Sequence, residues 1–167
     1  MCVGIYTHYA HCDQAYYAVR LAELFRIVGV PFDIYSDILP ARLQLSHDRA
    51  VRSREQLTFT DWVKKQQVVI WTHIPRVEQI NYCQRRGIKT VLVPMWQDMV
   101  SPFRKSLRRA DAVIALSSEA KELYTAVYKL KNVVYIPFDT GAPITRKDTP
   151  VTARNIRLFL PLSLIHI

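Results

Sequence analysis

Residues that could do chemistry follow the predicted strands of this sequence, at the points where the strands end. Their side chains can move protons, exchange hydrogen bonds or stack on a ligand. They are Thr7, His8, His11, Asp37, Thr72, His73, Trp96, Gln97, Asp98, Ser117 and Asp139. Taken alone, each of them is more simply a turn residue or a helix cap. Together they indicate a binding site, because the carboxyl ends of parallel strands meet at one edge of a sheet.

The elements that would position these residues alternate between strand and helix. Residues 111–124, DAVIALSSEAKELY, show the unit: a short apolar run ends in two serines, and a helical pattern follows. Ser118 is the predicted N-cap of that helix, with Glu119 and Glu122 in its first turn. The other predicted strands are 2–7, 32–37, 68–74, 89–96 and 133–138, and the other predicted helices are 14–28, 60–65, 75–87 and 101–109. Six strands separated by helical segments predict an α/β fold with a Rossmann-like, doubly wound and mainly parallel sheet. Residues 38–58 are polar and basic, and we expect a loop there with a short helix at most.

Several familiar reactions lack their sequence motifs. The turn after the first predicted strand, YTHYAHCDQAYY, contains no glycine, so a dinucleotide cannot bring its pyrophosphate against the backbone as in a G-x-G-x-x-G turn. No Walker motif and no G-x-S-x-G elbow occur in the chain. We therefore expect neither a nicotinamide or flavin cofactor nor serine-hydrolase chemistry.

The same turn holds residues that could ligate a metal, namely His8, His11, Cys12 and Asp13. Zinc requires three or four fixed ligands, and these four residues share one flexible loop. Asp13 is equally suited to cap the following helix. Because no second group of ligands is visible in the sequence, we expect no metal site.

The chain has 167 residues and a formal charge of +9, with basic clusters in 42–54, 85–89, 104–109 and 146–157. Such charge attracts phosphates and anionic lipid headgroups, which leaves peripheral contact with an anionic membrane open. Solvated helix faces explain most of the clusters, and no zinc-finger or RNA-binding motif accompanies them, so we expect no dedicated nucleic-acid binding. The sequence has no apolar stretch of membrane-spanning length, no signal peptide and three unpatterned cysteines, which together predict a cytoplasmic protein.

Residues 110–141, ADAVIALSSEAKELYTAVYKLKNVVYIPFDTG, resemble the closing segment of the N-terminal domain of GT-B glycosyltransferases of the family 4 type. The positions that fit the family outline are Ser117, Glu119, Lys121, Leu123, Val133, Ile136, Pro137 and Asp139. The upstream runs VVIWTHI and KTVLVPMW also resemble strands of that domain, in their residue types and in their positions along the chain. The resemblance therefore covers about residues 1–150. Three features depart from it: the first turn lacks the usual glycine pair, MWQD stands where many members have a histidine, and IPFDTG replaces the usual Asn-Gly.

The resemblance implies a glycosyltransferase whose N-terminal domain holds the acceptor and whose second domain holds a nucleotide-sugar. We expect residues 1–141 to form the acceptor-side domain, 142–154 a linker, and 155–167 the start of a truncated second domain. The last six residues, LSLIHI, also resemble the translation of a sequencing-library adapter. The nucleotide-sugar would be a co-substrate for an unknown acceptor, with no further cofactor, and the piece alone would be inactive.

The resemblance also suggests roles for the strand-end residues. His73 and Asp98 would be catalytic and would orient or deprotonate the acceptor. Trp96 would give a stacking surface. The remaining acceptor-binding residues would be Thr7, His8, His11, Thr72, Gln97, Ser117 and Asp139. The alternative is a non-catalytic Rossmann-like domain that binds a phosphate-bearing ligand at the same edge. A basic pair and an E-x7-E-like pattern further along the chain would favour the enzyme.

Overall fold

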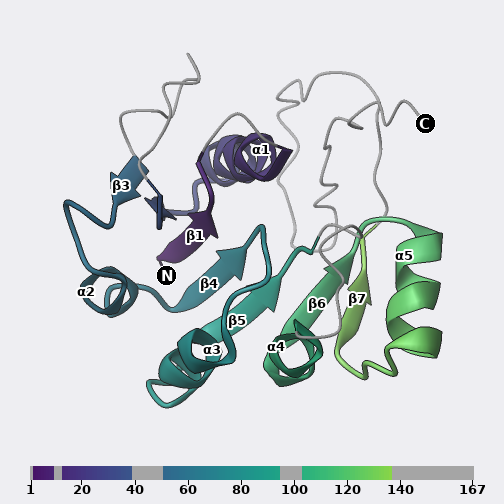
Figure 1. Cartoon of the computed structure of the whole chain (residues 1–167). Coiled ribbons are helices and arrows are strands. Elements are labelled where there is room, and N and C mark those ends of the chain that lie inside the picture. Colours follow the sequence, from purple (N-terminus) through teal and green to yellow (C-terminus); the bar gives the residue numbers. More distant parts are fainter. Residues whose placement is uncertain (1, 10–12, 39–50, 95–102, 137–167) are drawn as a thin grey trace.

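The computed structural model describes residues 2–9, 13–38, 51–94 and 103–136. Its centre is a seven-stranded, all-parallel sheet in the order β3-β2-β1-β4-β5-β6-β7 (Figure 1). The strands are β1 (Val3–Thr7), β2 (Phe32–Ser36), β3 (Val51–Ser53), β4 (Val68–Trp71), β5 (Lys89–Leu92), β6 (Ala112–Ala115) and β7 (Val133–Tyr135). The direction in which strands are added reverses at β1: β2 and β3 follow on one side of it, and β4 to β7 on the other. This confirms the predicted Rossmann-like α/β fold.

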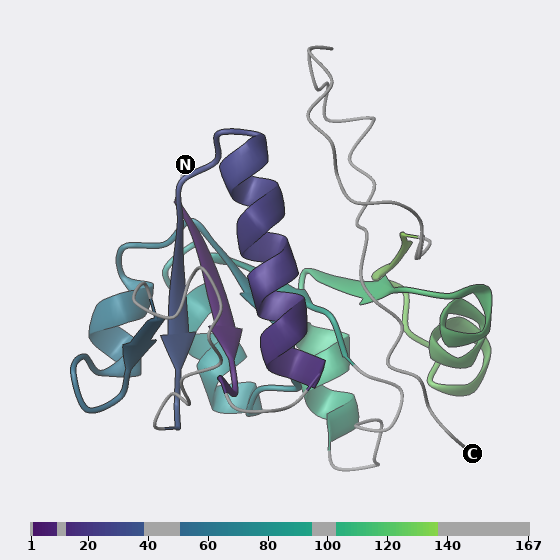
Figure 2. The ribbon, with the colours of Figure 1, turned by 90° about the horizontal axis from the view of Figure 1, so that it is seen from above.

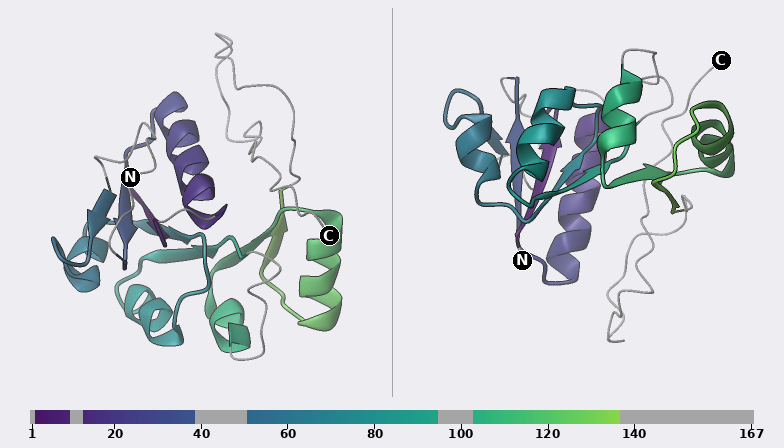
Figure 3. Two further views of the ribbon diagram at one scale, coloured as in Figure 1. Left: turned by 45° about the horizontal axis from the view of Figure 1, so that its top comes forward. Right: turned by 90° about the horizontal axis from the view of Figure 1, so that it is seen from below.

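Helices cover both faces of the sheet. They are α1 (Asp13–Ile27), α2 (Phe59–Val63), α3 (Val77–Gln84), α4 (Arg104–Arg109), α5 (Ser118–Glu122) and the π-helical turn η4 (Leu123–Val127). Figures 2 and 3 show α1 next to β1 on one face, and α2, α3 and α4 side by side on the other; α1 contacts both β1 and β2. Within the described ranges, none of these helices has the length and apolar character needed to cross a membrane.

The core has two layers, one on each face of the sheet. Successive side chains of a strand point to opposite faces, so the inner strands β1, β2, β4, β5 and β6 contribute to both layers. On β1, Tyr6 packs with Trp71 and Trp62 beneath α2 and α3, whereas Ile5 packs with Ile34 beneath α1. This two-sided burial explains why the strands read as continuous apolar runs.

Strand β3 lies inside the segment that the sequence analysis predicted to be loop, so that prediction is wrong for residues 51–53. Val51 pairs with Ile34 and Ser53 with Ser36, which places β3 at the edge of the sheet. Val51 and Ser53 are buried and Arg52 is exposed. An alternation of only three residues is too short to be recognised as a strand in a polar segment.

The N-cap of α5 is Ser117, not Ser118 as predicted. Ser117 has an extended backbone, and its hydroxyl accepts a hydrogen bond from the Ala120 backbone N–H at 3.1 Å. Strand β6 ends at Ala115, one residue earlier than the apolar run suggests, and the helix therefore begins one residue earlier as well. The exposed Ser118 is the first residue of the helix.

Replacing Ser117 with alanine should therefore lower the free energy of unfolding by about 1 kcal/mol, because the Ala120 N–H loses its acceptor. The matched change Ser118→Ala should alter it by less than about 0.5 kcal/mol, since that side chain is exposed. Urea unfolding of the two variants compares them directly. If Ser118→Ala lowered the free energy of unfolding more than Ser117→Ala does, Ser118 rather than Ser117 would be the N-cap.

Gly4 lies where a helix side chain presses against the sheet. A Cβ atom at this position would lie 2.7 Å from Cη2 and 2.8 Å from Cζ2 of Trp62, and 2.9 Å from Cγ of Gln66. The Trp62 indole is fully buried, and its Nε1 donates to Asp33 Oδ2 at 3.0 Å. The indole therefore cannot move aside without disturbing β2.

We expect Gly4→Ala to destabilise the fold by about 1 to 3 kcal/mol, as overpacked core positions do. The loss should be smaller in a Trp62→Phe background, because the shorter ring lacks the clashing atoms. Urea unfolding of the two single variants and the double variant measures this coupling. Equal losses in both backgrounds would show that Trp62 does not restrict position 4.

Candidate functional site

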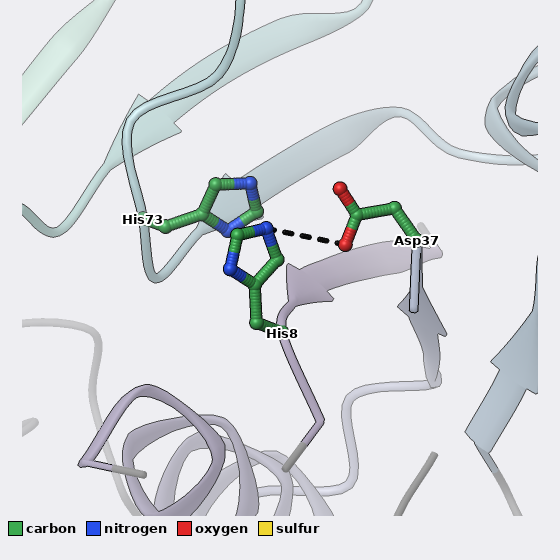
Figure 4. A group of neighbouring side chains, drawn as sticks. All are labelled: His8, Asp37 and His73. Carbon is green, nitrogen blue, oxygen red and sulfur yellow. Dashed lines mark ion pairs between the residues drawn. The ribbon is translucent and has the colours of Figure 1, made fainter. Parts of the chain in front are cut away.

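Three polar side chains converge at the carboxyl ends of three adjacent strands. His8 follows β1, Asp37 follows β2, and His73 lies in the turn after β4 (Figure 4). His8 Nε2 lies 3.2 Å from Asp37 Oδ1. The His8 and His73 rings stack, with centroids 4.1 Å apart and planes inclined by 26°. We call these three residues the strand-end triad.

The triad differs in exposure and in charge. The side chains of His8 and Asp37 are 39% and 35% exposed, whereas His73 is only 7% exposed. Burial, helped by the nearby charge of His8, lowers the pKa of His73 to about 3, although Asp37 acts in the opposite direction. His73 is therefore neutral near neutral pH. Burial tends to raise the pKa of Asp37, but the contact with His8 at 3.2 Å and the positive charge of His8 outweigh burial and lower that pKa. Asp37 is thus an ionised carboxylate that orients an imidazole.

The triad forms one wall of a pocket of about 800 Å³. The pocket is lined by Tyr6, His8, Asp37, Ile38, His73, Ile74, Pro75, Arg76, Glu78, Gln79 and Phe103. Its polar groups sit among apolar and aromatic surfaces, as is typical of sites for small molecules or for one group of a larger ligand. Gln79 donates to the Tyr6 hydroxyl at 3.1 Å and joins the first turn of α3 to β1. Burial raises the pKa of Tyr6, which stays protonated.

Two of the predicted acceptor-binding residues, Thr7 and Thr72, make hydrogen bonds inside the protein instead of facing the pocket. Thr72 Oγ1 donates to Thr7 Oγ1 at 2.8 Å, and Thr7 Oγ1 donates to the Gln14 carbonyl at 3.1 Å. Both threonines are buried and neither lines the pocket. They tie β1, β4 and the start of α1 together beneath the triad. Ser117 is the N-cap described above and also lies off the pocket.

Five other predicted site residues lie outside the described residues. They are His11, Trp96, Gln97, Asp98 and Asp139. The predicted linker and the start of a second domain, 142–167, lie outside them too. The roles suggested for these positions remain predictions. Of the predicted set, the structure places His8 and His73 together at the pocket.

Sequence reasoning gave no role to several residues that line the pocket. Asp37 was recognised as a strand-end residue only, although its position after β2 matches that of His8 after β1. Arg76 and Gln79 belong to the HIPRVEQ segment that turns from β4 into α3. This segment places polar side chains directly after a strand end, and that pattern could have indicated that both residues line the site. Tyr6 and Phe103 are apolar in pattern, and nothing in the sequence distinguishes them from core residues.

No protein-family model matches the sequence, and no curated protein is significantly similar to it. Solved structures do match. One is an alpha-glucosyltransferase in complex with UDP and a 13-mer DNA containing a HMU base, with a TM-score of 0.55 and 15% identity over 81% of this chain and 42% of that chain. Another is an alpha-glucosyltransferase with UDP and a 13-mer DNA containing a central A:G mismatch, with a TM-score of 0.52 and 13% identity over 81% of this chain and 40% of that one. The chain thus spans about two fifths of the length of these proteins.

These comparisons correct one expectation from the sequence. Dedicated nucleic-acid binding was set aside because no known motif accompanies the positive charge, yet both matched glucosyltransferases hold DNA. The lack of a motif does not exclude such binding, because a Rossmann-like sheet can present phosphate contacts without a dedicated nucleic-acid motif. At this level of identity the likeness concerns the fold, and the described residues of this chain share the Rossmann-like architecture found in UDP-binding glucosyltransferases.

Proposed function

We propose that this chain is the acceptor-side half of a glycosyltransferase of the GT-B type, which moves a sugar from a nucleotide-sugar to a hydroxyl group carried on DNA. The observation that supports this most is the strand-end triad. It faces a pocket at the carboxyl edge of a sheet similar to that of two DNA-bound glucosyltransferases. Ligands of open α/β sheets bind at this edge, next to the strand from which the order reverses.

The chemistry of the triad suits an attacking hydroxyl. Sugar transfer requires the acceptor oxygen to lose its proton and the leaving diphosphate to be stabilised. Asp37 and His8 supply an anionic carboxylate and an imidazole that is more than one third exposed at the pocket wall. His73 was the predicted catalytic histidine, but it is buried under the ring of His8. We therefore assign the contact with the acceptor to His8 and Asp37, with His73 as their support. A catalytic role for Asp98 remains part of the proposal.

The donor site would belong to another part of the protein. The chain covers only about two fifths of each matched glucosyltransferase, and these proteins bind UDP. In the arrangement that we propose, a second Rossmann-like domain closes over the pocket and supplies the groups that hold the diphosphate. The family 4-like resemblance of residues 110–141 supports this arrangement, in which the present chain is truncated before the donor domain.

The charge of the chain agrees with a DNA-borne acceptor. Its formal charge is +9, and exposed Arg76 stands at the rim of the pocket, where it could meet a backbone phosphate. The free thiols of Cys2 and Cys83 suit a reducing compartment, which supports the proposed cytoplasmic location.

The proposal is tested by incubating the longer protein, including the region downstream of residue 161, with a panel of nucleotide-sugars. The acceptor should be a duplex with hydroxymethylated pyrimidines, and unmodified duplex serves as the control. Mass spectrometry of the DNA nucleosides should show one added sugar on the hydroxymethylated duplex alone. The 167-residue chain run in parallel should release no nucleoside diphosphate. If the longer protein binds a phosphate-bearing ligand in the pocket but transfers no sugar, the non-catalytic alternative replaces this one.

A further inference from the structure

The strand-end triad has the composition of a metal site with three protein ligands. Two imidazoles and one carboxylate, from the ends of β1, β2 and β4, place one ligand atom each within 4.8 Å of one another. In the sequence, the candidate metal ligands near His8 all lie on its own loop, and for that reason no metal site was expected. The fold supplies the second group of ligands, since Asp37 and His73 reach His8 from neighbouring strands.

Two atoms of the triad are buried without a hydrogen-bond partner among the described residues: Asp37 Oδ1, which has His8 Nε2 at 3.2 Å as an ion-pair neighbour, and His73 Nδ1. Buried polar atoms are rarely left unpaired, and an exception calls for a specific explanation such as an ion. Figure 4 shows the ring of His73 overlapping that of His8, and Asp37 joined to the same His8 ring by the ion pair.

We propose that His8, Asp37 and His73 bind one divalent transition-metal ion of the Zn²⁺ or Co²⁺ type at the wall of the pocket. Imidazole nitrogen is a favoured ligand of these ions, and a carboxylate oxygen completes a common set of three. Mg²⁺ fits poorly, because it prefers an octahedral shell of oxygen ligands. Three protein ligands leave a further coordination position open toward the pocket, as in catalytic rather than structural zinc sites.

Binding requires a local adjustment of His8. Bond lengths of about 2.0 to 2.2 Å place tetrahedral ligand atoms about 3.3 to 3.5 Å apart. The present separation of His8 Nε2 and Asp37 Oδ1, 3.2 Å, is close to this range. An ion lies in the plane of each imidazole that binds it, and two stacked rings cannot both direct a lone pair to one point. His8 must therefore turn about its side-chain bonds. It has room to do so, because it is 39% exposed, whereas buried His73 is held in place.

The inference deepens the proposed function without depending on it for ion binding. A hydroxyl at the open position of such an ion loses its proton more readily than a free hydroxyl does. In the proposed enzyme, that hydroxyl would be the acceptor. There, His8, Asp37 and His73 would hold the ion, the ion would lower the pKa of the acceptor hydroxyl, and the proton would pass to water in the open pocket.

The test uses the whole 167-residue chain without an affinity tag. Zn²⁺ binding is measured by calorimetry, and Co²⁺ is added as a spectroscopic probe of the ligands. The variants are His8→Gln and Asp37→Asn, which change partly exposed side chains and keep their approximate size. Cys2→Ser is the matched control, because Cys2 is a free thiol outside the triad. Circular dichroism establishes that each variant is folded.

We expect one equivalent of Zn²⁺, a visible Co²⁺ spectrum without a thiolate band, and no competition by Mg²⁺. Each triad variant should bind Zn²⁺ more than about 100-fold more weakly, since even residues that only support metal ligands are worth about 10- to 100-fold. Cys2→Ser should bind as the parent does. Absence of Zn²⁺ binding, or binding that the triad variants leave unchanged, would refute the site.

The complete enzyme separates this inference from the proposed function. Sugar transfer that is lost on chelation and restored by Zn²⁺ or Co²⁺ supports both. If transfer survives chelation but is lost in Asp37→Asn, the proposed function stands and a role of the metal in sugar transfer is rejected. Zn²⁺ binding at the triad in an enzyme that transfers no sugar keeps the metal site and rejects the function.

Discussion

Asp37→Asn should lower kcat for sugar transfer by the complete enzyme by about 10²- to 10⁴-fold, the range typical for loss of a group that assists proton transfer. The amide keeps the shape of the carboxylate but not its charge, so it can neither orient His8 as an anion nor serve as an ionised metal ligand. His8→Gln should give a loss of the same order. KM for the nucleotide-sugar should change little, because the donor would bind to the other domain.

The matched control for this experiment is Glu23→Gln on α1. It makes the same change from carboxylate to amide at a side chain whose visible partner is Arg20, 3.0 Å away. Its kcat should stay within about twofold of the parent. Stability measured beside activity keeps the comparison sound, since exposed polar substitutions usually change the free energy of unfolding by less than about 0.5 kcal/mol. If Asp37→Asn and Glu23→Gln were equally active, the triad would have no part in catalysis.

Binding of the chain to duplex DNA should weaken about 10³-fold between about 50 mM and about 200 mM salt, if some six phosphates are contacted. The physical reason is the release of counterions from the DNA when cationic side chains replace them. Arg76→Gln removes an exposed cation at the pocket rim. It should make the slope of log affinity against log salt concentration shallower by about one unit.

Arg20→Gln is the control for the salt experiment. Arg20 is also exposed, but it lies on α1, on the face of the sheet opposite α3 (Figure 1), and pairs with Glu23. Its removal should leave the slope unchanged. Fluorescence anisotropy with a labelled duplex gives both slopes. Equal shifts from Arg76 and Arg20 would mean that only the net charge matters and that the pocket edge does not touch the DNA.

The sequence predicted the fold well because its strands are buried on both faces and its helices have clear amphipathic patterns. Residues 68–71 and 112–115 read as strands from composition alone, and both are. The predictions failed where the local structure depends on residues far away or on a neighbouring element. Strand β3 forms because it pairs with β2 at Ile34, and the start of the helix at Ser117 depends on where β6 ends.

The site was predicted only in outline, because its residues become neighbours through strand order rather than through spacing in the sequence. His8, Asp37 and His73 could be recognised as strand-end residues, and parallel topology places such residues at one edge. The sequence does not say that β1 lies between β2 and β4, and that order alone brings these three together. Thr7 and Thr72 were predicted to bind the acceptor because they also stand at strand ends. In the structure they are buried and hydrogen-bonded to each other.

The central place of β1 also has a consequence for how this chain folds. Strand β1 is synthesised before both of its neighbours. It pairs on one side with β2, but its other edge waits for β4, and the Thr7–Thr72 hydrogen bond spans 65 residues. At a synthesis rate of about 5 to 20 residues per second, that edge stays unpaired for several seconds. The nascent chain therefore exposes an apolar strand edge until β4 emerges, and we expect its early folding to be slow and prone to aggregation.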